Sequence, residues 1–374
     1  MKRLRKIVYL TGSRAEFGLM QPILNKLNKK CNLGLIVTGS HLSKKHGYSI
    51  DEIRKEKYHI LNVIKTSEES NEPVEMVHNI SILLPKIAQI LTKFKPDLVL
   101  VEGDRFEQLS MAICASTMNI PVVHTSGGLV SKSIDDLYRN AITKLSHIHL
   151  VPSKKSAMRI IKMNEESWRV KNVGAIINYN VKNIDVYNKL NLKKTKPIIL
   201  VIQHSVTTEY DNAGKQMRET LKAIKSLGYQ TIIIYPNSDP GSKEIIKEIE
   251  KCRTLSFIKI FKNIENEIFM NLLKTIDVVV GNSSAAIHEA PFFKLPAVLV
   301  GNRQKNREHG DNVIHVDYNS KKIIGGINKS LNKNFYQNIH VNPFKAKHST
   351  ETRIVEILLK LKINSKLLSK EPVF

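Results

Sequence analysis

The segment Gly281–Ala290 contains residue types that could bind a diphosphate. It begins Gly-Asn-Ser-Ser-Ala-Ala and follows the strand-like run Asp277–Val280. Small residues let a phosphate approach the start of a helix, where backbone N–H groups and the hydroxyls of Ser283 and Ser284 can bind it. Glu289, a turn and a half later, could accept two sugar hydroxyls. The alternative is a serine helix cap followed by a solvent-facing glutamate.

A second group of polar residues follows two apolar runs in the first half of the chain. The run Leu98–Val101 ends at Gly103-Asp104-Arg105, and the run Ile120–Val123 leads into His124-Thr125-Ser126-Gly127-Gly128. A helical pattern separates the runs, so we expect a strand, a crossover helix and a second strand. Ligands of open α/β sheets bind beyond the carboxyl ends of the strands, so these residues are candidates for a ligand site. The alternative is two ordinary strand-to-helix turns.

Asp135 and Arg139 stand four residues apart in the helical pattern Ile134–Leu145. This spacing places both side chains on one face of the helix. They form either a surface ion pair worth roughly a few tenths of a kcal/mol, or a carboxylate that a guanidinium holds beside the substrate. The spacing by itself leaves both interpretations open.

Arg14 and His41 are two further candidates near the N-terminus. Arg14 lies in the glycine-bearing turn Thr11–Gly18, which feeds a helical pattern. Backbone N–H groups at a helix start can hold an anion, and Arg14 adds a fixed positive charge. His41 follows the apolar run Leu33–Thr38, so it also lies at the carboxyl end of a predicted strand. A structural cap or turn histidine fits that position as well as a catalytic histidine.

The elements that must position these residues form two domains of the α/β class. At 374 residues the chain is too long for one typical core. We expect an N-terminal Rossmann-like domain over 1–177, a lysine-rich linker over 178–196, a second Rossmann-like domain over 197–345, and a C-terminal helix and tail over 346–374. Two such doubly wound domains with a phosphate site in the second are typical of a GT-B-like nucleotide-sugar enzyme that binds its ligand in the cleft between them.

Each predicted strand is an apolar run that ends in small polar residues. The polar ends of the later runs place His204, Asn237 and Arg303 after strands, as candidates for ligand contacts. The predicted strands are Ile7–Leu10, Leu33–Thr38, Leu98–Val101, Ile120–Val123, Ile148–Val151, Val173–Ala175, Pro197–Ile202, Thr231–Tyr235, Asp277–Val280 and Ala297–Val300.

Composition argues against several classes of protein. The net charge is +24, but the lysines and arginines are spread over the whole chain and only 6% of residues are aromatic, so we expect no nucleic-acid partner. No run reaches the roughly 18 apolar residues that a membrane span needs. The basic start is not followed by a signal cleavage site. Three widely spaced cysteines form no disulfide or zinc pattern, which favours a reducing compartment, the cytoplasm.

A set of motifs in fixed order resembles the hydrolysing UDP-N-acetylglucosamine 2-epimerases. That family starts sialic acid synthesis, and a sister branch acts on UDP-N,N′-diacetylbacillosamine on the way to legionaminic acid. The resemblance spans roughly residues 5–320. The motifs are TGSRAEFG, GSHL followed by Gly47-Tyr48, VEGDRFE, HTSGG, IDDLYRNAITKLSHIH, QHSVTTE, YPNSDPGSKE, GNSSAAIHEA and GNRQKNRE.

The resemblance implies conversion of UDP-N-acetylglucosamine to UDP and N-acetylmannosamine. Removal of the C2 proton and anti elimination of UDP give a 2-acetamidoglycal, and water then adds to give the C2-inverted free sugar. This chemistry needs a base near C2 and charge stabilisation at the departing diphosphate. It implies no metal and no other cofactor. The family suggests a homodimer or homotetramer, with the UDP-sugar as the small-molecule partner.

The resemblance also implies a role for each matching site residue. Asp104 and Asp135 are the acid/base candidates, and His204 would serve the diphosphate or the leaving group. The implied sugar-side residues are His41, Asp104, Asp135, Arg139 and His204, and the implied UDP-binding residues are Arg14, Glu16, Arg105, Asn237, Ser283, Ser284, Glu289 and Arg303.

This chain departs from the family pattern near the expected catalytic acids. Ser126 and Leu129 stand where the family usually has an acid or histidine and then a glutamate. Asn140 replaces a usual histidine, and Ser205 a usual proline. A serine hydroxyl cannot act as an unassisted base at neutral pH. Three explanations stay open: Asp104 and Asp135 suffice, the substrate differs, or epimerisation is impaired.

Several functions therefore remain under consideration. The first is a hydrolysing 2-epimerase of UDP-N-acetylglucosamine, and the second is the same reaction on UDP-N,N′-diacetylbacillosamine. A glycosyltransferase of the same two-domain class would release UDP only when an acceptor is present. A UDP-sugar-binding protein without turnover would bind UDP but form no glycal.

Overall fold

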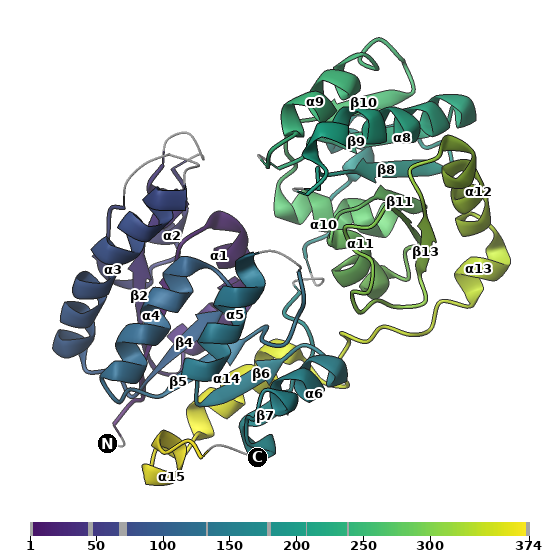
Figure 1. Cartoon of the computed structure of the whole chain (residues 1–374). Helices are drawn as coiled ribbons and strands as arrows, with labels where there is room; N and C mark the ends of the chain where they lie inside the picture. The colour runs from purple at the N-terminus through teal and green to yellow at the C-terminus, as the bar shows by residue number, and fades with distance from the viewer. Residues whose placement is uncertain are drawn as a thin grey trace. The chain divides into compact units, whose positions relative to one another are not determined.

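The first sheet of the computed structural model has seven parallel strands in the order β3-β2-β1-β4-β5-β6-β7 (Figure 1). The strand order reverses between β1 and β4, which makes this pair the switch point of the sheet. The structure describes residues 3–43, 48–66, 73–131, 134–177, 181–206, 208–237 and 239–371. The strands are β1 (Lys6–Thr11), β2 (Asn32–Val37), β3 (His59–Val63), β4 (Leu98–Glu102), β5 (Val122–Thr125), β6 (Ile148–Val151) and β7 (Val170–Asn172).

The second sheet has six parallel strands in the order β10-β9-β8-β11-β12-β13, with its switch point between β8 and β11. Both sheets are doubly wound and Rossmann-like, which confirms the predicted fold class. The strands are β8 (Ile198–Ile202), β9 (Gln230–Ile234), β10 (Ile258–Phe261), β11 (Val278–Gly281), β12 (Ala297–Val300) and β13 (Val313–Val316).

The predicted strand Val173–Ala175 was wrong, because the edge strand in this part of the chain, β7, covers Val170–Asn172 instead. Three further strands that the apolar runs do not predict, β3, β10 and β13, also lie at sheet edges. Their sequences are HILNV, IKIF and VIHV, in which polar residues interrupt short apolar runs. Central strands such as β4 and β8 are instead almost wholly buried. A parallel strand covered on both faces must be apolar throughout, whereas an edge strand need not be. The continuous apolar runs therefore predicted the interior of each sheet and not its border.

Helices alternate with the strands along the chain. In β1, Ile7 and Tyr9 pack into one buried cluster and Val8 and Leu10 into another, because successive strand residues point to opposite faces. Both faces are thus covered by helices. The helices are α1 (Arg14–Asn28), α2 (Ile50–Lys55), α3 (Pro73–Phe94), α4 (Phe106–Thr117), α5 (Ile134–Leu145), α6 (Lys154–Lys162), α7 (Val186–Lys189), α8 (Ala213–Leu227), α9 (Ser242–Glu250), α10 (Asn266–Thr275), α11 (Ala285–His288), α12 (Ser320–Ser330), α13 (Lys333–Gln337), α14 (Thr350–Lys360) and α15 (Ser365–Leu368), with short 3-10 turns η1 (Gly39–Leu42), η2 (Ser167–Arg169), η3 (Tyr210–Asn212) and η4 (Ala290–Phe293).

The chain divides into two compact units, Met1–Ile176 with Phe344–Phe374, and Ile177–Pro343. The described part of the segment expected to be a linker lies in the second unit, where Asn271 of α10 donates a hydrogen bond to the Lys182 oxygen at 2.9 Å. Residues 178–180, 372–374 and the motif residue Gly47 lie outside the described residues.

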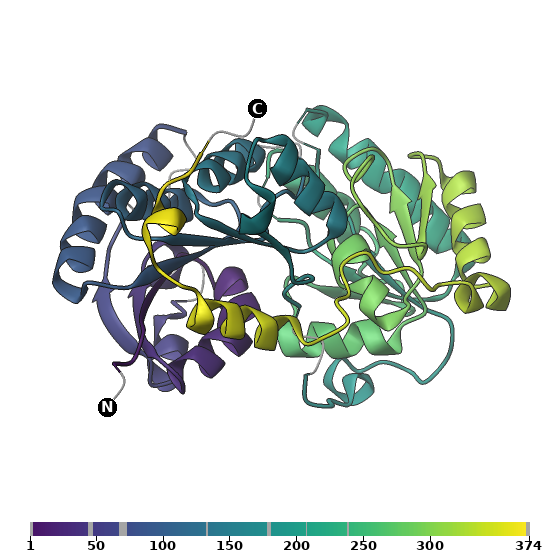
Figure 2. The same cartoon turned by 90° about the horizontal axis from the view of Figure 1, so that it is seen from below.

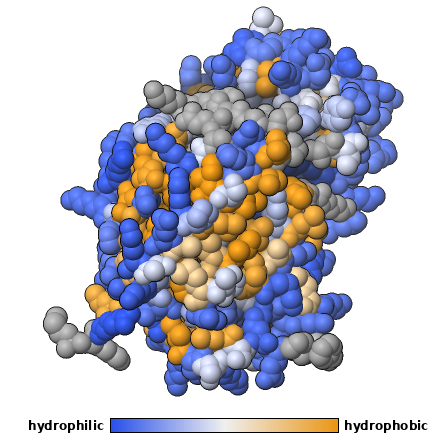
Figure 3. Space-filling view, turned by 60° about the vertical axis from the view of Figure 1, so that its left-hand side comes forward, coloured by the Kyte–Doolittle hydropathy of each residue, from blue (hydrophilic) through white to orange (hydrophobic). Residues whose placement is uncertain are grey.

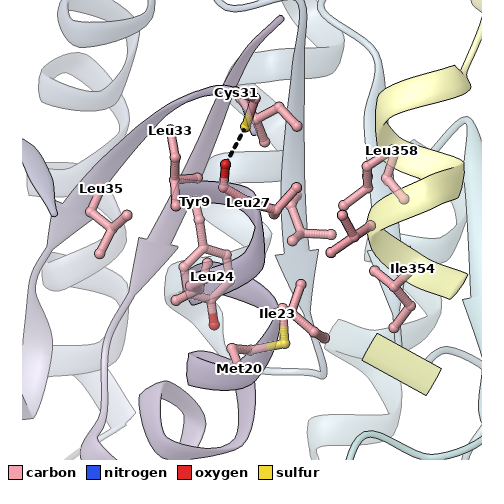
Figure 4. Close-up of a cluster of buried hydrophobic side chains, with 14 of the residues drawn as sticks. Tyr9, Met20, Ile23, Leu24, Leu27, Cys31, Leu33, Leu35, Ile354 and Leu358 are labelled. Atoms are coloured by element: carbon pink, nitrogen blue, oxygen red, sulfur yellow. Dashed lines mark hydrogen bonds between the residues drawn. The ribbon is translucent and has the colours of Figure 1, made fainter. Parts of the chain in front are cut away.

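The C-terminal helices return to the first unit. α14 packs against α1, and Figure 2 shows the two helices side by side. Figure 4 shows Ile354 and Leu358 of α14 pointing into the buried cluster that includes Leu27 of α1. Beyond α14, the buried Arg169 side chain donates to the backbone oxygens of Leu367 at 2.8 Å and of neighbouring residues. The C-terminal segment is therefore part of the first unit's core.

The face of the first unit that carries α3 is rich in apolar side chains. Figure 3 brings this face forward and shows a broad apolar area on it. Val74 and Val77 of α3 are 69% and 66% exposed. An exposed apolar area of this kind is available for contact with another surface.

Candidate active site

The carboxyl edge of the first sheet gathers polar residues at its switch point. β1 ends at Thr11 and its neighbour β4 ends at Glu102, so the turns after both strands begin at one edge. In the first turn the Ser13 hydroxyl accepts a hydrogen bond from the Glu16 N–H at 3.4 Å and caps α1. The second turn holds Asp104. The sheet order thus brings two predicted ligand-binding turns to one place.

Arg139 orients Asp104. Its side chain is 4% exposed and forms ion pairs with Asp104 and Asp136. The spacing predicted Asp135 as the partner on the helix, but among the ion pairs of described residues Arg139 takes Asp136, three residues before it. Both positions neighbour residue 139 on a helix, and the Asp136 carboxylate also accepts from the Ser131 N–H at 2.7 Å, which places it between helix and loop.

The two predicted acid/base residues share one electrostatic environment. Burial raises the pKa of Asp104, the positive charge of Arg139 opposes that shift, and the negative charge of Asp135 adds to it. The structure therefore brings Asp104, Asp135 and Arg139 together. Two carboxyl groups and one guanidinium are suited to proton transfer and to orienting a bound sugar.

Glu102 is a carboxyl group at this edge that the motifs do not single out. It is the last residue of β4, and its side chain is half-buried. Burial raises the pKa of Glu102 to about 7, the charge of Asp104 adds to the shift, and Ser126 and Arg139 oppose it. The sequence analysis did not predict it; a glutamate as the last residue of an otherwise apolar strand is the signal that could have identified it.

The segment 124–128 is held as a rigid turn. Its first two residues belong to β5, so the prediction that this strand ends at residue 123 was wrong. His124 is fully buried and its Nε2 donates to the Gly103 oxygen at 2.9 Å. Burial lowers the pKa of His124 to about 3, so the ring is a neutral structural group. Gly128 has φ 75°, and a Cβ there would lie 2.4 Å from the Ser156 oxygen.

His41 lies close to the same edge but is enclosed. Its Nε2 lies 2.9 Å from the Thr11 hydroxyl and its Nδ1 lies 2.7 Å from the Ser49 hydroxyl. Burial lowers the pKa of His41 to about 4, so the ring is neutral at pH 7. These contacts match the structural interpretation of His41, a histidine that joins the turns after β1 and β2.

The two arginines predicted to bind UDP in the first unit both have acidic partners. Arg14 pairs with Glu52 of α2, and both side chains are about half exposed. Arg105 donates two hydrogen bonds to the buried Glu107, at 3.0 and 2.8 Å. A Cβ at Gly12 would lie 2.8 Å from the Glu107 carboxylate, which explains the glycine in that turn. Arg105 and Glu107 therefore form one fixed, half-exposed cation site.

Glu16 lies beneath this edge and not on it. It is 6% exposed, and its Oε1 accepts from the Tyr9 hydroxyl and from Gln108 Nε2, the latter at 2.9 Å. Burial raises the pKa of Glu16 to about 8, and the charge of Glu102 adds to the shift. The side chain predicted to contact UDP is thus largely protonated at neutral pH, and its enclosed position suits an electrostatic role below the site.

Asn282 connects the polar turns of the second unit. Its Oδ1 accepts from the His204 N–H at 2.7 Å, and its Nδ2 donates to the His204 oxygen at 2.8 Å. The Asn282 backbone oxygen accepts from Arg303 at 3.2 Å and from Gln304 at 2.8 Å. The turns after β8, β11 and β12 are fixed to one another in this way. Asn282 belongs to a quoted motif, but only the fold shows what it connects.

His204 is held as a neutral hydrogen-bond donor. Its Nδ1 accepts from the Asn237 N–H at 3.1 Å, so the proton of the neutral ring lies on Nε2. Burial lowers the pKa of His204 to about 4, and the positive charge of Arg303 adds to the shift. The Asn237 side chain donates to Asp239 at 2.7 Å. His204 can therefore donate from Nε2 to an anionic oxygen without carrying charge.

Ser283 and Ser284 follow β11 as predicted, but the next helix is short. The helix expected after these serines is present as α11, which has only four residues and leads into η4. The Ser283 hydroxyl accepts from the Ala285 N–H at 3.3 Å. Gly281 has φ 130°, and a Cβ there would lie 2.1 Å from the Ile202 oxygen. Only glycine lets β8 and β11 end this close together.

Glu289 lies where α11 meets η4. Its half-buried carboxylate has one buried oxygen, Oε2, without a hydrogen-bond partner among the described residues. Burial raises the pKa of Glu289 to about 7, and the charge of Arg307 opposes the shift. A buried carboxylate oxygen with no hydrogen-bond partner is suited to accept a hydrogen bond from a hydroxyl group of a ligand.

The structure gathers the predicted residues into two groups, one in each unit. Four predicted residues have partners of their own and belong to neither group: Arg14, Glu16, His41 and Arg105. The first group is Asp104, Asp135 and Arg139, with Glu102 added, and the second is His204, Asn237 and Arg303 around Asn282, with Ser283, Ser284 and Glu289 at the end of β11.

The described residues contain neither a metal-binding cluster nor a membrane-spanning helix. No group of three or more histidine, cysteine, aspartate or glutamate side chains is arranged to hold a metal ion in the part of the chain that is described. None of the described helices is both long and apolar enough to cross a membrane.

The chain is similar to known 2-epimerases in sequence and in structure. A family model described as UDP-N-acetylglucosamine 2-epimerase matches residues 25–359. The chain is 35% identical to UDP-N,N′-diacetylbacillosamine 2-epimerase (hydrolyzing) of Legionella pneumophila, over 98% of this chain and 99% of that protein. It is 33% identical to UDP-N-acetylglucosamine 2-epimerase of Neisseria meningitidis, over 87% and 88%. The solved structure of UDP-GlcNAc 2-epimerase from Neisseria meningitidis bound to UDP-GlcNAc is similar with a TM-score of 0.78 at 19% identity, covering 95% of this chain and 100% of that one.

Proposed function

Because the chain belongs to the UDP-N-acetylglucosamine 2-epimerase family, we propose that it is a hydrolysing 2-epimerase of a UDP-N-acetylated aminosugar. UDP-N-acetylglucosamine is the first candidate substrate, and UDP and N-acetylmannosamine are the products. The observation that carries the proposal is the group formed by Asp104, Asp135 and the buried Arg139 at the switch point of the first sheet. That group supplies carboxyl groups for proton transfer and a cation that orients one of them.

The proposed reaction has two steps. A base removes the C2 proton, the C–H electron pair forms the C1–C2 double bond of a 2-acetamidoglycal, and the C1–O bond breaks as UDP leaves with its electron pair. Water then adds its hydroxyl at C1 while an acid protonates C2 from the opposite face. Asp104 and Asp135 are the acid/base residues in this scheme, and Arg139 orients Asp104.

UDP binding is assigned to polar and charged residues of the turns that follow the strands. His204 donates from Nε2 to the departing diphosphate, and Arg303 provides positive charge beside it. Glu289 accepts hydrogen bonds from the ribose hydroxyls through Oε2, which has no hydrogen-bond partner among the described residues. Donors aimed at a leaving diphosphate lower the barrier to its departure. The full set of proposed UDP contacts is Arg14 and Arg105 in the first unit and Asn237, Ser283, Ser284, Glu289 and Arg303 in the second, with Glu16 as a buried support.

UDP-N,N′-diacetylbacillosamine is the second candidate substrate. One observation favours it: the Legionella pneumophila relative, 35% identical over nearly the whole of both chains, carries that substrate in its name. The Neisseria meningitidis relative, which carries UDP-N-acetylglucosamine in its name, is 33% identical over 87% of this chain. Turnover of both nucleotide sugars under identical conditions decides between them.

The test is a reaction in D₂O with each nucleotide sugar and no acceptor. We expect UDP release and a free, C2-inverted sugar that carries deuterium at C2. NMR and mass spectrometry measure this deuterium. Asp104→Asn should lower this incorporation at least about 100-fold if Asp104 takes part in proton transfer. Release of UDP only after an acceptor is added would instead identify a glycosyltransferase. Tight UDP binding by calorimetry without glycal or deuterated sugar would identify a binding protein.

The cellular setting is proposed on the same basis. We place the enzyme in the cytoplasm, at the start of sialic or legionaminic acid synthesis, where the resemblance places its family. We also propose a homodimer or homotetramer, for which the apolar face that includes Val74 and Val77 offers a surface. Light scattering coupled to size exclusion would measure the mass, and a monomer at micromolar concentration would contradict this part.

A further inference from the structure

The C-terminal end of α5 is capped by a lysine from the C-terminal segment. Lys370 Nζ donates to the backbone oxygens of Lys144 and Ser146, both at 2.8 Å. These oxygens belong to the last turn of α5 and to the residue that follows the helix, where carbonyl groups have no partner within the helix. A positive charge at this end also matches the helix dipole. The C-terminal segment thus supplies a fixed donor to the helix that carries Arg139.

The same ammonium group forms an ion pair with a buried acid. Lys370 Nζ lies 2.7 Å from Oε2 of Glu165, whose side chain is fully buried. Lys144 Nζ lies 2.8 Å from Oε1 of this carboxylate, and Nε2 of His149 in β6 lies 3.2 Å from Oε2. Removing one partner from a buried ion pair is costly, because the other charge stays buried. Lys370 therefore joins the end of α5 to Glu165 and to β6.

The backbone that carries Lys370 is held in place as well. Arg169 donates to the backbone oxygen of Ser369, the preceding residue, at 2.6 Å and to that of Leu367 at 2.8 Å. The Leu367 side chain is 2% exposed and packs in the buried cluster of the first unit. The donor that caps α5 is thus anchored to the core of the first unit and not to a free tail.

Two sets of contacts lead from α5 to the turn that carries Asp104. Arg139 forms the ion pair with Asp104 itself. Thr143 Oγ1 lies 3.3 Å from Nδ1 of His124, and Nε2 of His124 donates to the Gly103 oxygen at 2.9 Å. Gly103 is the residue before Asp104. A shift of α5 along its axis would therefore disturb Asp104 both directly and through the backbone next to it.

We propose that Lys370 is a positioning residue for Asp104: it fixes the C-terminal end of α5, from which Arg139 and Thr143 hold the turn after β4. The inference rests on the proposed function, which assigns Asp104 to proton transfer. Without the ammonium group the last turn of α5 loses its partners, and the helix is freer to move. Proton transfer depends on the distance and orientation of the reacting groups. Lys370 therefore increases the fraction of molecules in which Asp104 is correctly placed.

The first test replaces the lysine in the full chain. Lys370→Met keeps the unbranched shape and removes the ammonium group. We expect kcat for UDP release to fall about 3- to 30-fold, while KM and the Kd for UDP stay within about twofold. Lys362→Met, the same change at an exposed lysine of the same segment, is the matched control and should change none of the three constants. A folded Lys370→Met protein whose kcat falls less than threefold, or whose UDP affinity falls as much as its kcat, overturns the inference.

A second background separates positioning from general stabilisation. In Asp104→Asn the carboxylate that Lys370 is proposed to position is missing, so adding Lys370→Met should lower the remaining rate less than about twofold. A lysine that only stabilises the fold would lower the rate by the same factor in both backgrounds. That result would overturn the inference.

Chemical rescue tests whether the ammonium group is the part of Lys370 that matters. Lys370→Cys should lose kcat as Lys370→Met does, and 2-bromoethylamine then builds a side chain that ends in an ammonium group at nearly the length of lysine. The lysine side chain is 23% exposed, whereas Cys31, Cys114 and Cys252 are all buried, so position 370 should react first. Alkylation should restore kcat to within about threefold of the wild type, and a kcat that stays low contradicts the proposal.

Thr143→Val tests the same helix end without changing the C-terminal segment. The change keeps the shape of the buried side chain and removes the hydroxyl beside His124. We expect kcat to fall at least threefold with an unchanged Kd for UDP. If Lys370→Met does not fold, this variant decides, and an unchanged kcat in it overturns the inference.

The failure of this inference can be told from the failure of the proposed function. If the wild type releases no UDP from either nucleotide sugar, the proposed function fails and the role of Lys370 in catalysis fails with it. If the wild type turns over and the variants keep its kcat, only the role of Lys370 fails. Backbone hydrogen exchange in the last turn of α5 is measured in both cases. Exchange in Lys370→Met that is no faster than in the wild type would show that Lys370 does not fix the end of α5.

Discussion

UDP affinity should depend on pH through Glu289. One buried oxygen of this carboxylate has no hydrogen-bond partner in the described part of the chain, and burial raises the pKa of Glu289 to about 7. Only the ionised form accepts hydrogen bonds from two ribose hydroxyls, and the ionised fraction increases as pH rises through the pKa. With a pKa of about 7 the ionised fraction is about 10% at pH 6 and about 90% at pH 8. The contribution of Glu289 to UDP affinity should therefore increase about ninefold between these two pH values.

Glu289→Gln isolates this contribution. A neutral amide replaces the carboxylate, so charge-assisted hydrogen bonds worth about 1.5–3 kcal/mol each are weakened, and we expect UDP to bind about 10- to 100-fold more weakly at pH 8. Titration calorimetry at pH 6, 7 and 8 and constant ionic strength measures both proteins. UDP itself titrates in this range, so the informative quantity is the ratio of the variant's Kd to that of the wild type.

The ratio should fall about ninefold from pH 8 to pH 6, because the wild type loses its carboxylate while the amide does not titrate. A ratio that stays constant within about twofold would refute the assignment of Glu289 to the ribose hydroxyls. A ratio near one at pH 8 would show that UDP does not use this residue at all.

Three further changes test the framework around the two groups. Asn282→Ala leaves the backbone groups of His204 without their partners, so we expect a loss of about 1–3 kcal/mol in urea unfolding and a lower kcat from a displaced His204. Gly281→Ala should lower the free energy of unfolding by about 3 kcal/mol or prevent folding, because the added Cβ meets a backbone oxygen. The control is Gly325→Ala in α12, where the added Cβ meets nothing within 4 Å. This control should keep the free energy of unfolding or raise it by up to about 1 kcal/mol. Arg169→Ala removes the donor that binds three carbonyls of the C-terminal segment. Backbone hydrogen exchange in this segment should become much faster, and the free energy of unfolding should fall by about 3 kcal/mol. Unchanged exchange would show that packing alone holds the segment.

The apolar runs predicted the central strands of both sheets because a strand that is buried on both faces is apolar at nearly every position. They also predicted which turns lie at the carboxyl edges, and hence Asp104, His204 and Ser283 as site candidates. The edge strands were missed because one side of each meets solvent or loop and tolerates polar residues.

The partners of the site residues were decided by the tertiary structure alone. Residues 135 and 136 are equally close to Arg139 in a helical sequence, and the contact of Asp136 with the preceding loop decided between them. Glu16 sits in a motif that suggested a UDP contact, yet the packing of α1 against β1 buries it beside Tyr9.

Glu102 and Ser126 show most clearly how the information in the sequence differs from the information in the tertiary structure. The sequence by itself determined that position 126 has no acid, since residue types can be read directly. It could not determine that Glu102 lies beside this segment, because that depends on the parallel pairing of β4 with β5, in which Glu102 stands opposite Thr125. Strand order is set by the packing of the whole sheet, and contacts that depend on it leave no local pattern in the chain.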